Sequence, residues 1–251
     1  MKEILEINNL SKSFEIESGK LLVLDGINMT VKNGEILCIV GPSGCGKSTL
    51  LSQIAGFDGP DTGYIKLGKN KISKPGLNRV MVFQDLNQLF PWKTVLENVV
   101  FPLKVNKIGN SKHERLEIAQ RYLSMVKLED FYNYYSHKLS GGMKQRVAIA
   151  RALAINPEIL LMDEPFGSLD IQTRTNLQNM LIDIWRKTKV TVIFVTHDIQ
   201  EAILLSNRII VMGKSPGNIK KVINNELPRP RNIIDGEFSM LYKEVYNLME
   251  V

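Results

Sequence analysis

The sequence is poor in cysteine and has no long apolar run. Only Cys38 and Cys45 occur among its 251 residues, which is too few for a disulfide framework and favours a reducing compartment. No segment approaches the ~18 consecutive apolar residues that a membrane span requires. The N-terminus lacks the charged and then apolar layout of a signal peptide. We therefore expect a cytoplasmic chain that can work at a membrane only beside another protein that crosses it.

The overall composition is that of an ordinary soluble globular protein. Hydrophobic residues make up 44% of the chain and charged residues 23%. The length of 251 residues allows one large domain or two small ones. The net charge of +6 suits an anionic ligand or a membrane-adjacent partner, but an ordinary solvated surface explains it equally well.

Short apolar runs alternate with helical patterns along most of the chain. Five runs have the length and composition of strands: Ile36–Val40, Val80–Phe83, Ile159–Met162, Val190–Val195 and Arg208–Met212. Three stretches show helical periodicity: Lys112–Met125, Gly142–Ala154 and Thr173–Lys187. The alternation predicts an α/β fold with a mostly parallel sheet whose faces are covered by helices.

Two regions depart from this alternation. Glu3–Thr30 alternates apolar and polar residues and is predicted to form antiparallel strands, whereas residues 85–154 predict an inserted helical subdomain. We expect one domain over residues 4–235 and a C-terminal tail over residues 236–251. Prolines keep Leu227–Arg231 extended, and we expect this run to cover part of the surface.

One run matches the phosphate-binding pattern G-x-x-x-x-G-K-[ST]. Its residues are Gly41, Pro42, Ser43, Gly44, Cys45, Gly46, Lys47, Ser48 and Thr49. A predicted strand precedes it and a predicted helix follows, so its backbone N–H groups and the positive helix end favour phosphate. Lys47 is expected to reach the β- and γ-phosphates, and Ser48 to offer its hydroxyl to Mg²⁺.

Two carboxylates follow a later apolar strand. Asp163 and Glu164 end the run Ile159–Met162, where one acid can help to hold Mg²⁺ and the other can activate water as a general base. Because neighbouring strand residues point to opposite faces, either the two acids have different tasks or the strand ends at Asp163.

A second anion-binding loop precedes that strand. Ser140, Gly141 and Gly142 stand at the start of a predicted helix, so the serine can cap the helix and the glycines leave its backbone N–H groups accessible.

Taken in this order, the motifs resemble those of the ATP-binding subunit of ABC transporters, a family of P-loop NTPases. The resemblance covers nearly the whole chain and lies in the P-loop at Gly41–Thr49, a Q-loop at Gln84, the signature at Leu139–Gly142, the Walker B strand at Ile159–Glu164, a D-loop at Ser168–Asp170 and a switch histidine at His197. Phe83–Asp85, Leu89–Trp92 and Leu227–Arg231 resemble the nitrate, sulfonate and taurine importer branch.

The resemblance implies a head-to-tail homodimer with each ATP between two chains. Lys47, Ser48 and Thr49 of one chain would bind the phosphates and Mg²⁺, and Ser140 and Gly142 of the other would close over the γ-phosphate. The loop of the second chain stabilises the charge that develops on the γ-phosphate only when the two chains close on ATP. Hydrolysis is therefore coupled to closure of the dimer.

The resemblance also assigns roles to single residues. Glu164 would be the general base and Asp163 would hold Mg²⁺ through water. Gln84 would touch Mg²⁺ or the attacking water and sense the membrane partner. His197 would contact the γ-phosphate, and Asp170 would help to join the two chains.

Three residues have alternative interpretations, and a fourth departs from the family pattern. Phe14 would stack on adenine, although core packing is the alternative. Trp92 would receive a cytoplasmic helix of the permease, or it packs inside the helical subdomain. Cys45 is either a reactive thiol or a spacer, and a spacer fits better. Met143 stands where the family often has Gln, which removes one side-chain amide but not the backbone of the loop.

The resemblance implies an ATPase that powers an importer of a small anion or organic solute. It would act at the cytoplasmic face of the membrane with permease subunits, indirectly with a solute-binding protein, and without nucleic acid. Soluble ABC-type ATPases are the alternative, but they usually carry two ATPase halves or a long coiled-coil insertion, and exporter halves are often fused to their own membrane spans. A kinase would not need the signature, and Asn70–Ser73 lacks the aspartate of the guanine-reading stretch of GTPases.

Overall fold

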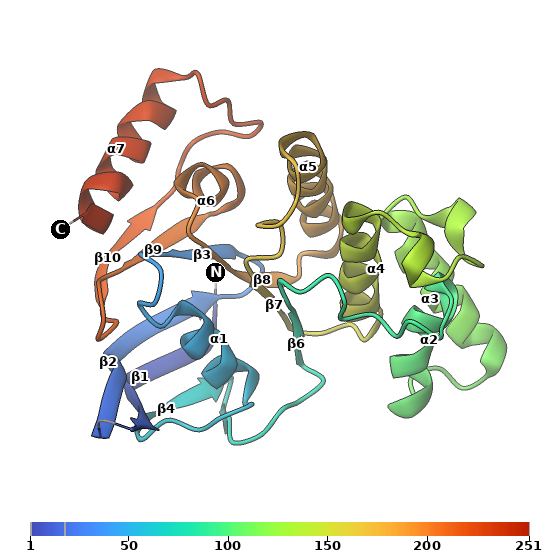
Figure 1. Ribbon diagram of the computed structural model, residues 1–251, viewed down its shortest axis with the longest axis horizontal. Coiled ribbons are helices and arrows are strands. Elements are labelled where there is room, and N and C mark those ends of the chain that lie inside the picture. The colour runs from blue at the N-terminus through green and yellow to red at the C-terminus, as the bar shows by residue number, and fades with distance from the viewer. Residues whose placement is uncertain (1, 18, 251) are drawn as a thin grey trace. The chain divides into compact units, whose positions relative to one another are not determined.

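The computed structural model describes residues 2–17 and 19–250. The chain divides into two compact units (Figure 1). The first unit combines Met1–Gly76 with Val190–Val251, and the second unit is Leu77–Lys189. Within the described residues, no helix has the length and apolar character needed to cross a membrane.

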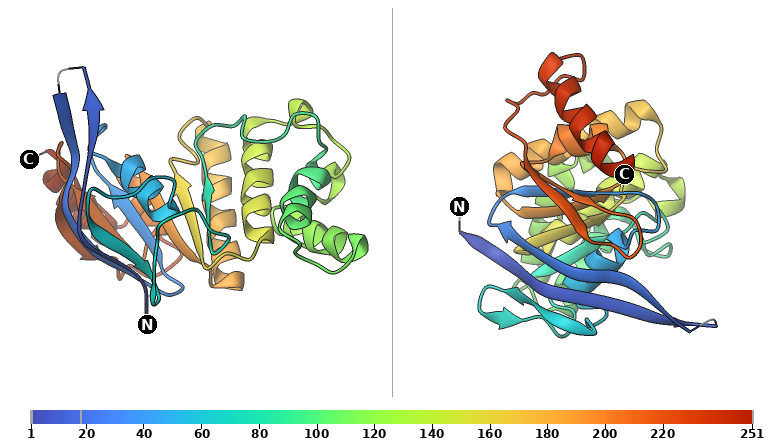
Figure 2. Two further views of the ribbon diagram at one scale, coloured as in Figure 1. Left: turned by 90° about the horizontal axis from the view of Figure 1, so that it is seen from below. Right: turned by 90° about the vertical axis from the view of Figure 1, so that its left-hand side faces the viewer.

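The first unit contains two sheets. Its elements are β1 (Glu3–Ile16), β2 (Gly19–Lys32), β3 (Ile36–Val40), α1 (Lys47–Ala55), β4 (Thr62–Leu67), β5 (Asn70–Lys71), β8 (Thr191–Thr196), α6 (Ile199–Leu205), β9 (Arg208–Met212), β10 (Ile219–Asn224) and α7 (Gly236–Glu250). One sheet is antiparallel in the order β2–β1–β4–β5, and β1 and β2 form its long hairpin (Figure 2). In the other, β3 lies between β8 and β9 and is parallel to both, while β10 pairs antiparallel with β9.

The core of the first unit lies around β3 and β8. Every residue of both strands is buried, which explains why they are continuously apolar rather than alternating. Helix α1 packs against β2 on one side and β8 on the other. The P-loop therefore leaves a fully buried strand and enters a helix that is held between two sheets.

The second unit is mostly helical. Its elements are β6 (Arg79–Val82), α2 (Val95–Val105), α3 (Lys112–Met125), the short 3₁₀ helices η1 (Glu129–Phe131) and η2 (Ser136–Lys138), α4 (Gly141–Ala154), β7 (Ile159–Asp163) and α5 (Ile171–Thr188). Strands β6 and β7 are parallel, and α2, α3 and α4 pack on one another.

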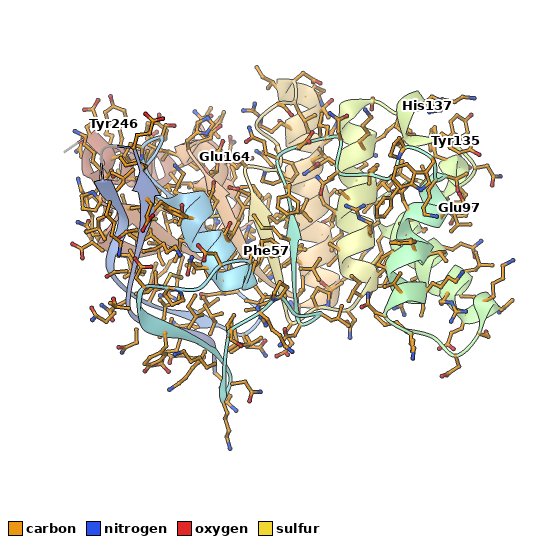
Figure 3. All side chains as sticks on the ribbon, turned by 60° about the horizontal axis from the view of Figure 1, so that its bottom comes forward. Phe57, Glu97, Tyr135, His137, Glu164 and Tyr246 are labelled. Carbon is orange, nitrogen blue, oxygen red and sulfur yellow. The ribbon has the colours of Figure 1, made fainter. Side chains whose placement is uncertain are left out.

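The predicted α/β class, the mostly parallel sheet and the antiparallel N-terminal strands are confirmed. All five predicted strands and three predicted helices are present, with ends that differ by no more than two residues. Residues 85–154 carry helices and no strand of their own. The start of α2 is fixed by a capping box, because Thr94 Oγ1 accepts from Glu97 N–H and Glu97 Oε2 accepts from Thr94 N–H (Figure 3). The boundaries proposed for the domain and its tail stay a prediction.

The sequence analysis assigned no structure to β10 and α7. Helix α7 buries only Phe238 and Val245, while Met240 on the same helix is 73% exposed. It packs against α6 and β9 (Figure 1). Phe238, Leu241, Val245 and Leu248 recur at helical spacing, so the sequence does carry a periodic signal for this helix, and that signal was overlooked.

Candidate functional site

The P-loop wraps around the ammonium group of Lys47. Its Nζ donates to the carbonyl oxygens of Gly41 and Pro42, both at 2.9 Å, and the side chain is only 6% exposed. The Cys45 Sγ lies 4.0 Å away. A positive charge is therefore held at the centre of a tight backbone turn, as phosphate binding requires.

Two glycines make this turn possible for different reasons. Gly44 has φ +77° and open space around a would-be Cβ, so only its backbone conformation demands glycine. Gly46 has φ +95°, and a Cβ there would lie 2.7 Å from Leu24 Cδ2 and 3.1 Å from the Val23 carbonyl oxygen. Any other residue at position 46 would have a strained backbone and a Cβ too close to Leu24 and Val23.

The N-terminus of α1 is prepared for an anion. Gly46 is its N-cap and supplies no side-chain hydrogen bond, and the first turn contains no acidic residue. No side chain of the helix start therefore competes with a phosphate for the first N–H groups or for the positive end of the dipole. This is the geometry that the strand–loop–helix pattern predicted.

The turn between β9 and β10 supports the loop from outside, a feature that the sequence analysis missed. A Cβ on Gly217 would lie 2.0 Å from the Cys45 carbonyl oxygen. Gly217 also exchanges backbone hydrogen bonds with β2, donating to Val23 at 2.8 Å and accepting from Asp25 at 3.0 Å. No local motif announces this contact, because the glycine lies far from the P-loop in the sequence.

Cys45 behaves as a spacer within the loop. Its side chain is 1% exposed, and burial raises the pKa of its thiol above the ordinary value, against the lowering effect of Lys47. A thiol of raised pKa stays protonated near neutral pH and is a poor nucleophile.

His197 and Phe14 also belong to the first unit. His197 follows β8 directly and is exposed. After it, Asp198 caps α6 by accepting from Glu201 N–H at 3.2 Å, and its own N–H donates to Thr196 Oγ1 at 3.0 Å. Phe14 lies on β1, 41% exposed, with the Lys12 ammonium 5.3 Å from its ring centroid. This exposure argues against core packing and leaves the ring available for stacking.

In the second unit, strand β7 ends at Asp163, so the second of the two predicted possibilities is correct. Glu164 leaves the strand with φ +41° (Figure 3). A left-handed backbone is costly for a residue with a side chain, and such outliers gather at functional sites. The carbonyl of Glu164 accepts from Gly167 N–H at 3.1 Å, which closes a tight turn behind the carboxylate.

Gln84 and Glu164 lie beside the same turn. A Cβ built on Gly167 would be 3.5 Å from Gln84 Nε2 and 3.8 Å from Glu164 Oε2. The two side chains that the sequence placed around the attacking water thus come from distant segments to the surroundings of the same glycine.

The signature loop packs tightly at the start of α4. Ser140 caps this helix by accepting from Met143 N–H at 3.3 Å, and a serine hydroxyl that accepts in this way can still donate its own hydrogen to an anion. A Cβ on Gly142 would lie 2.5 Å from Thr173 Cγ2. A Cβ on Gly141 would lie 3.0 Å from Leu86 Cδ1 and 3.1 Å from Leu169 Cδ2. The glycines therefore allow the loop to approach α5.

The D-loop aspartate caps the next helix. Asp170 accepts from Thr173 N–H at 2.9 Å, and this backbone hydrogen bond lowers the pKa of its exposed carboxyl group. Ile171 beside it is 82% exposed. A charged cap and a large apolar side chain thus project together from one corner of the second unit.

Sequence reasoning missed the residues that hold the Q-loop. Gln88 Nε2 donates to the carbonyls of Phe83 and Asp85, both at 2.9 Å, and Gln145 Nε2 donates to Phe83 at 3.4 Å. Arg151 donates to the Gln88 carbonyl at 2.9 Å. Gln145 is fully buried on the apolar face of α4, and a glutamine at such a position is a signal that could have been noticed.

The residues assigned to a metal fit Mg²⁺ by their chemistry. Ser48, Gln84 and Asp163 offer only oxygen donors of the hydroxyl, amide and carboxylate kinds, which Mg²⁺ prefers over nitrogen and sulfur. So few protein ligands leave positions for phosphate oxygens and water, as is usual for Mg²⁺ with nucleotides.

Comparisons with known proteins agree with this geometry. Residues 24–167 match the family described as ABC transporter. The aliphatic sulfonates import ATP-binding protein of Bacillus cereus is 45% identical over 98% of this chain and 96% of its own length. The nitrate import ATP-binding protein of Synechocystis is 47% identical over 89% of this chain and 83% of its own length.

A solved structure extends the agreement to the fold. The dimeric structure of a post-hydrolysis state of an ATP-binding cassette bound to ADP and Pi is 35% identical and has a TM-score of 0.78. The match covers 90% of this chain and all of that chain. The chain therefore belongs to the ABC transporter family, as an ATP-binding and ATP-hydrolysing subunit.

Proposed function

We propose that this ATPase energises an importer of a small anion or organic solute of the nitrate, sulfonate or taurine type. The observation that carries the proposal is the near full-length similarity to import subunits named for aliphatic sulfonates and for nitrate. The alternative of a soluble ABC-type ATPase has no such support, because these relatives are named as import subunits.

In the proposed mechanism, two copies bind ATP head to tail. Lys47 and the α1 N-terminus of one copy hold the phosphates, and Ser140 with the N-terminus of α4 in the other copy faces the γ-phosphate. ATP favours the closed dimer only because both sets of contacts form there. The dimeric cassette bound to ADP and Pi supports this arrangement.

Hydrolysis in this mechanism depends on Glu164 as the general base. The left-handed backbone at Glu164 and the adjacent Gly167 hold its carboxylate beside the Gln84 amide, where a water molecule can be both oriented and deprotonated. Ser48, Gln84 and Asp163 would hold Mg²⁺, which would neutralise phosphate charge when bound. His197 contacts the γ-phosphate, Phe14 stacks on adenine, and Asp170 helps to join the copies.

The proposed contact with the permease lies around Trp92. This side chain is 69% exposed, with its ring 5.6 Å from that of Phe90, which in turn lies 4.8 Å from Phe101. The exposure argues against packing inside the helical subdomain. An exposed tryptophan backed by other rings is a typical anchor for a partner helix.

Replacing Trp92 by alanine should weaken binding to the permease and leave ATP affinity unchanged. Loss of such an anchor commonly costs about 2–4 kcal/mol of binding energy, or roughly 30- to 1000-fold in affinity. Copurification with detergent-solubilised permease measures it. Phe57→Ala is the matched control, since Phe57 is 53% exposed and lies in the other unit (Figure 3). Equal recovery of permease with Trp92→Ala and wild type would contradict the assignment.

The solute proposal is tested by reconstituting the ATPase with its permease and solute-binding protein in liposomes. A peripheral position on the cytoplasmic face requires that ATP act from the side on which the ATPase sits. We expect ATP-dependent uptake of one of nitrate, taurine or an alkanesulfonate. Uptake of none of them, alongside ATP-dependent uptake of a solute that carries neither a nitrate nor a sulfonate group, would contradict the proposed solute class.

A further inference from the structure

The C-terminal end of α6 is covered by side chains from a segment that the mechanism has not used. The last carbonyl groups of a helix have no partner within it and must find one elsewhere. Four carbonyl groups at this end each accept a hydrogen bond from a side chain of residues 225–231. They belong to Ile203, Leu204, Leu205 and Ser206.

Two arginines provide most of these hydrogen bonds. Arg231 Nη1 donates to Ile203 at 2.7 Å and to Ser206 at 2.6 Å. Arg229 donates to Leu204 at 3.0 Å through Nη1 and to Leu205 through Nη2. The planar guanidinium spans adjacent carbonyls with fixed geometry, which an ammonium group cannot do. We call Arg229 and Arg231 the arginine clamp.

The arginine clamp is itself fixed to the segment that carries it. Arg231 Nε donates to the Leu227 carbonyl at 3.1 Å, and its Nη2 donates to the Asn225 carbonyl at 3.2 Å. Asn225, 5% exposed, adds a hydrogen bond to the Ile203 carbonyl at 2.8 Å. The prediction of an extended run is wrong here, because the chain bends at Arg229 and Pro230. The bent segment holds two cations at one helix end.

The same segment is tied to the strand that leads to the P-loop. Asn225 N–H donates to the Asn207 carbonyl at 2.9 Å, and Asn207 exchanges two hydrogen bonds with Ile36 at the start of β3, at 2.7 and 2.9 Å. Helix α6 packs against both β3 and β8. The arginine clamp is therefore connected to α6, β3 and β8. Strand β3 leads into the P-loop, and β8 is followed by His197.

Placing two cations together carries an electrostatic cost. Burial, and then the charge of Arg229, lower the pKa of Arg231 to about 10. It still carries its charge at neutral pH, close to the negative end of the α6 dipole. A simple surface cover would need neither this burial nor this convergence of charge.

We propose that Arg229 and Arg231 are positioning residues that hold His197 in place through α6. His197 directly precedes Asp198, the N-cap of this helix, and seven helical residues span about 10 Å. A rigid helix this short transmits a shift at one end to the other. The importance of this for ATP hydrolysis rests on the proposed contact between His197 and the γ-phosphate.

The direct test uses the small number of histidines. The chain has three, His113, His137 and His197, so side-chain resonances of protein labelled with ¹⁵N-histidine can be assigned with His197→Ala. We expect Arg231→Lys to shift or broaden the His197 resonances and to leave the other two unchanged. Lys221→Ala is the matched control, because Lys221 is an exposed cation on β10, just before the same segment, and pairs with Glu244 on α7.

The functional readout separates positioning from general damage. Arg231→Lys keeps a cation at the helix end and should fold, and we expect kcat for ATP to fall at least about tenfold while the nucleotide Kd changes by less than about twofold. Lys221→Ala should match wild type in both quantities. Arg229→Lys provides a second test of the same kind and should act in the same direction.

Two results would overturn the proposal. One is an unchanged His197 resonance in both lysine variants, and the other is an equal disturbance of all three histidines, which indicates a general loss of structure. A normal kcat in His197→Ala would instead contradict the proposed role of His197 in hydrolysis and leave the resonance test of the arginine clamp valid.

Discussion

Glu164→Gln is expected to bind ATP with wild-type affinity and to hydrolyse it about 10²- to 10⁴-fold more slowly, which is the usual contribution of a general base. The amide has nearly the shape of the carboxylate, so the turn at Gly167 and the left-handed backbone at position 164 can be retained. An amide cannot accept the proton of the attacking water. ATP binding without turnover should therefore accumulate the closed dimer, which light scattering after gel filtration with ATP and Mg²⁺ detects.

Glu158→Gln is the matched control for this change. Glu158 precedes the same strand β7 at its opposite end and is exposed, so the chemical change is identical but the site differs. It should hydrolyse ATP at the wild-type rate and remain monomeric or dimeric as wild type does. Hydrolysis by Glu164→Gln within about threefold of wild type would rule out a general base at this position, since such a group contributes far more.

Much of the site was predictable because its signals are local. The P-loop is a contiguous run whose glycines, lysine and flanking strand and helix all point to phosphate binding, and the structure has that strand, turn and helix. The end of β7 was also predictable, because Asp163 and Glu164 interrupt an apolar run. Ser140 and Thr94 are caps recognisable from residue type and position alone.

The rest depended on contacts between distant segments. Gly217 faces the Cys45 carbonyl, and Arg231 faces the end of α6, but no spacing in the sequence encodes either approach. The prolines predicted an extended segment, which is wrong because the chain bends at Arg229 and Pro230. Two arginines in such a run usually indicate only a solvated surface. Only the structure shows that these arginines donate to the carbonyl groups at the end of α6, which need partners outside the helix.

Lys47→Ala is expected to lower ATP affinity at least about 100-fold. Hydrogen bonds to charged groups are worth about 1.5–3 kcal/mol each, and every 1.4 kcal/mol is about tenfold in affinity. The ammonium is 6% exposed, so water screens its attraction for phosphate only weakly. Titration with a fluorescent ATP analogue measures the loss, and Lys71→Ala on β5, an exposed lysine of the same unit, serves as the control.

The same lysine also stabilises the empty loop, so binding and folding must be separated. Without its Nζ, the carbonyls of Gly41 and Pro42 lose a donor, which costs about 1–3 kcal/mol if water does not replace it. Thermal unfolding distinguishes the two effects, because bound ATP raises the stability of the folded state by an amount that grows with the logarithm of the ATP concentration divided by Kd. We expect a modestly lower melting temperature without nucleotide and no further rise with ATP. A rise as large as that of wild type would show that phosphate binding does not depend on Lys47, and it would contradict the P-loop assignment.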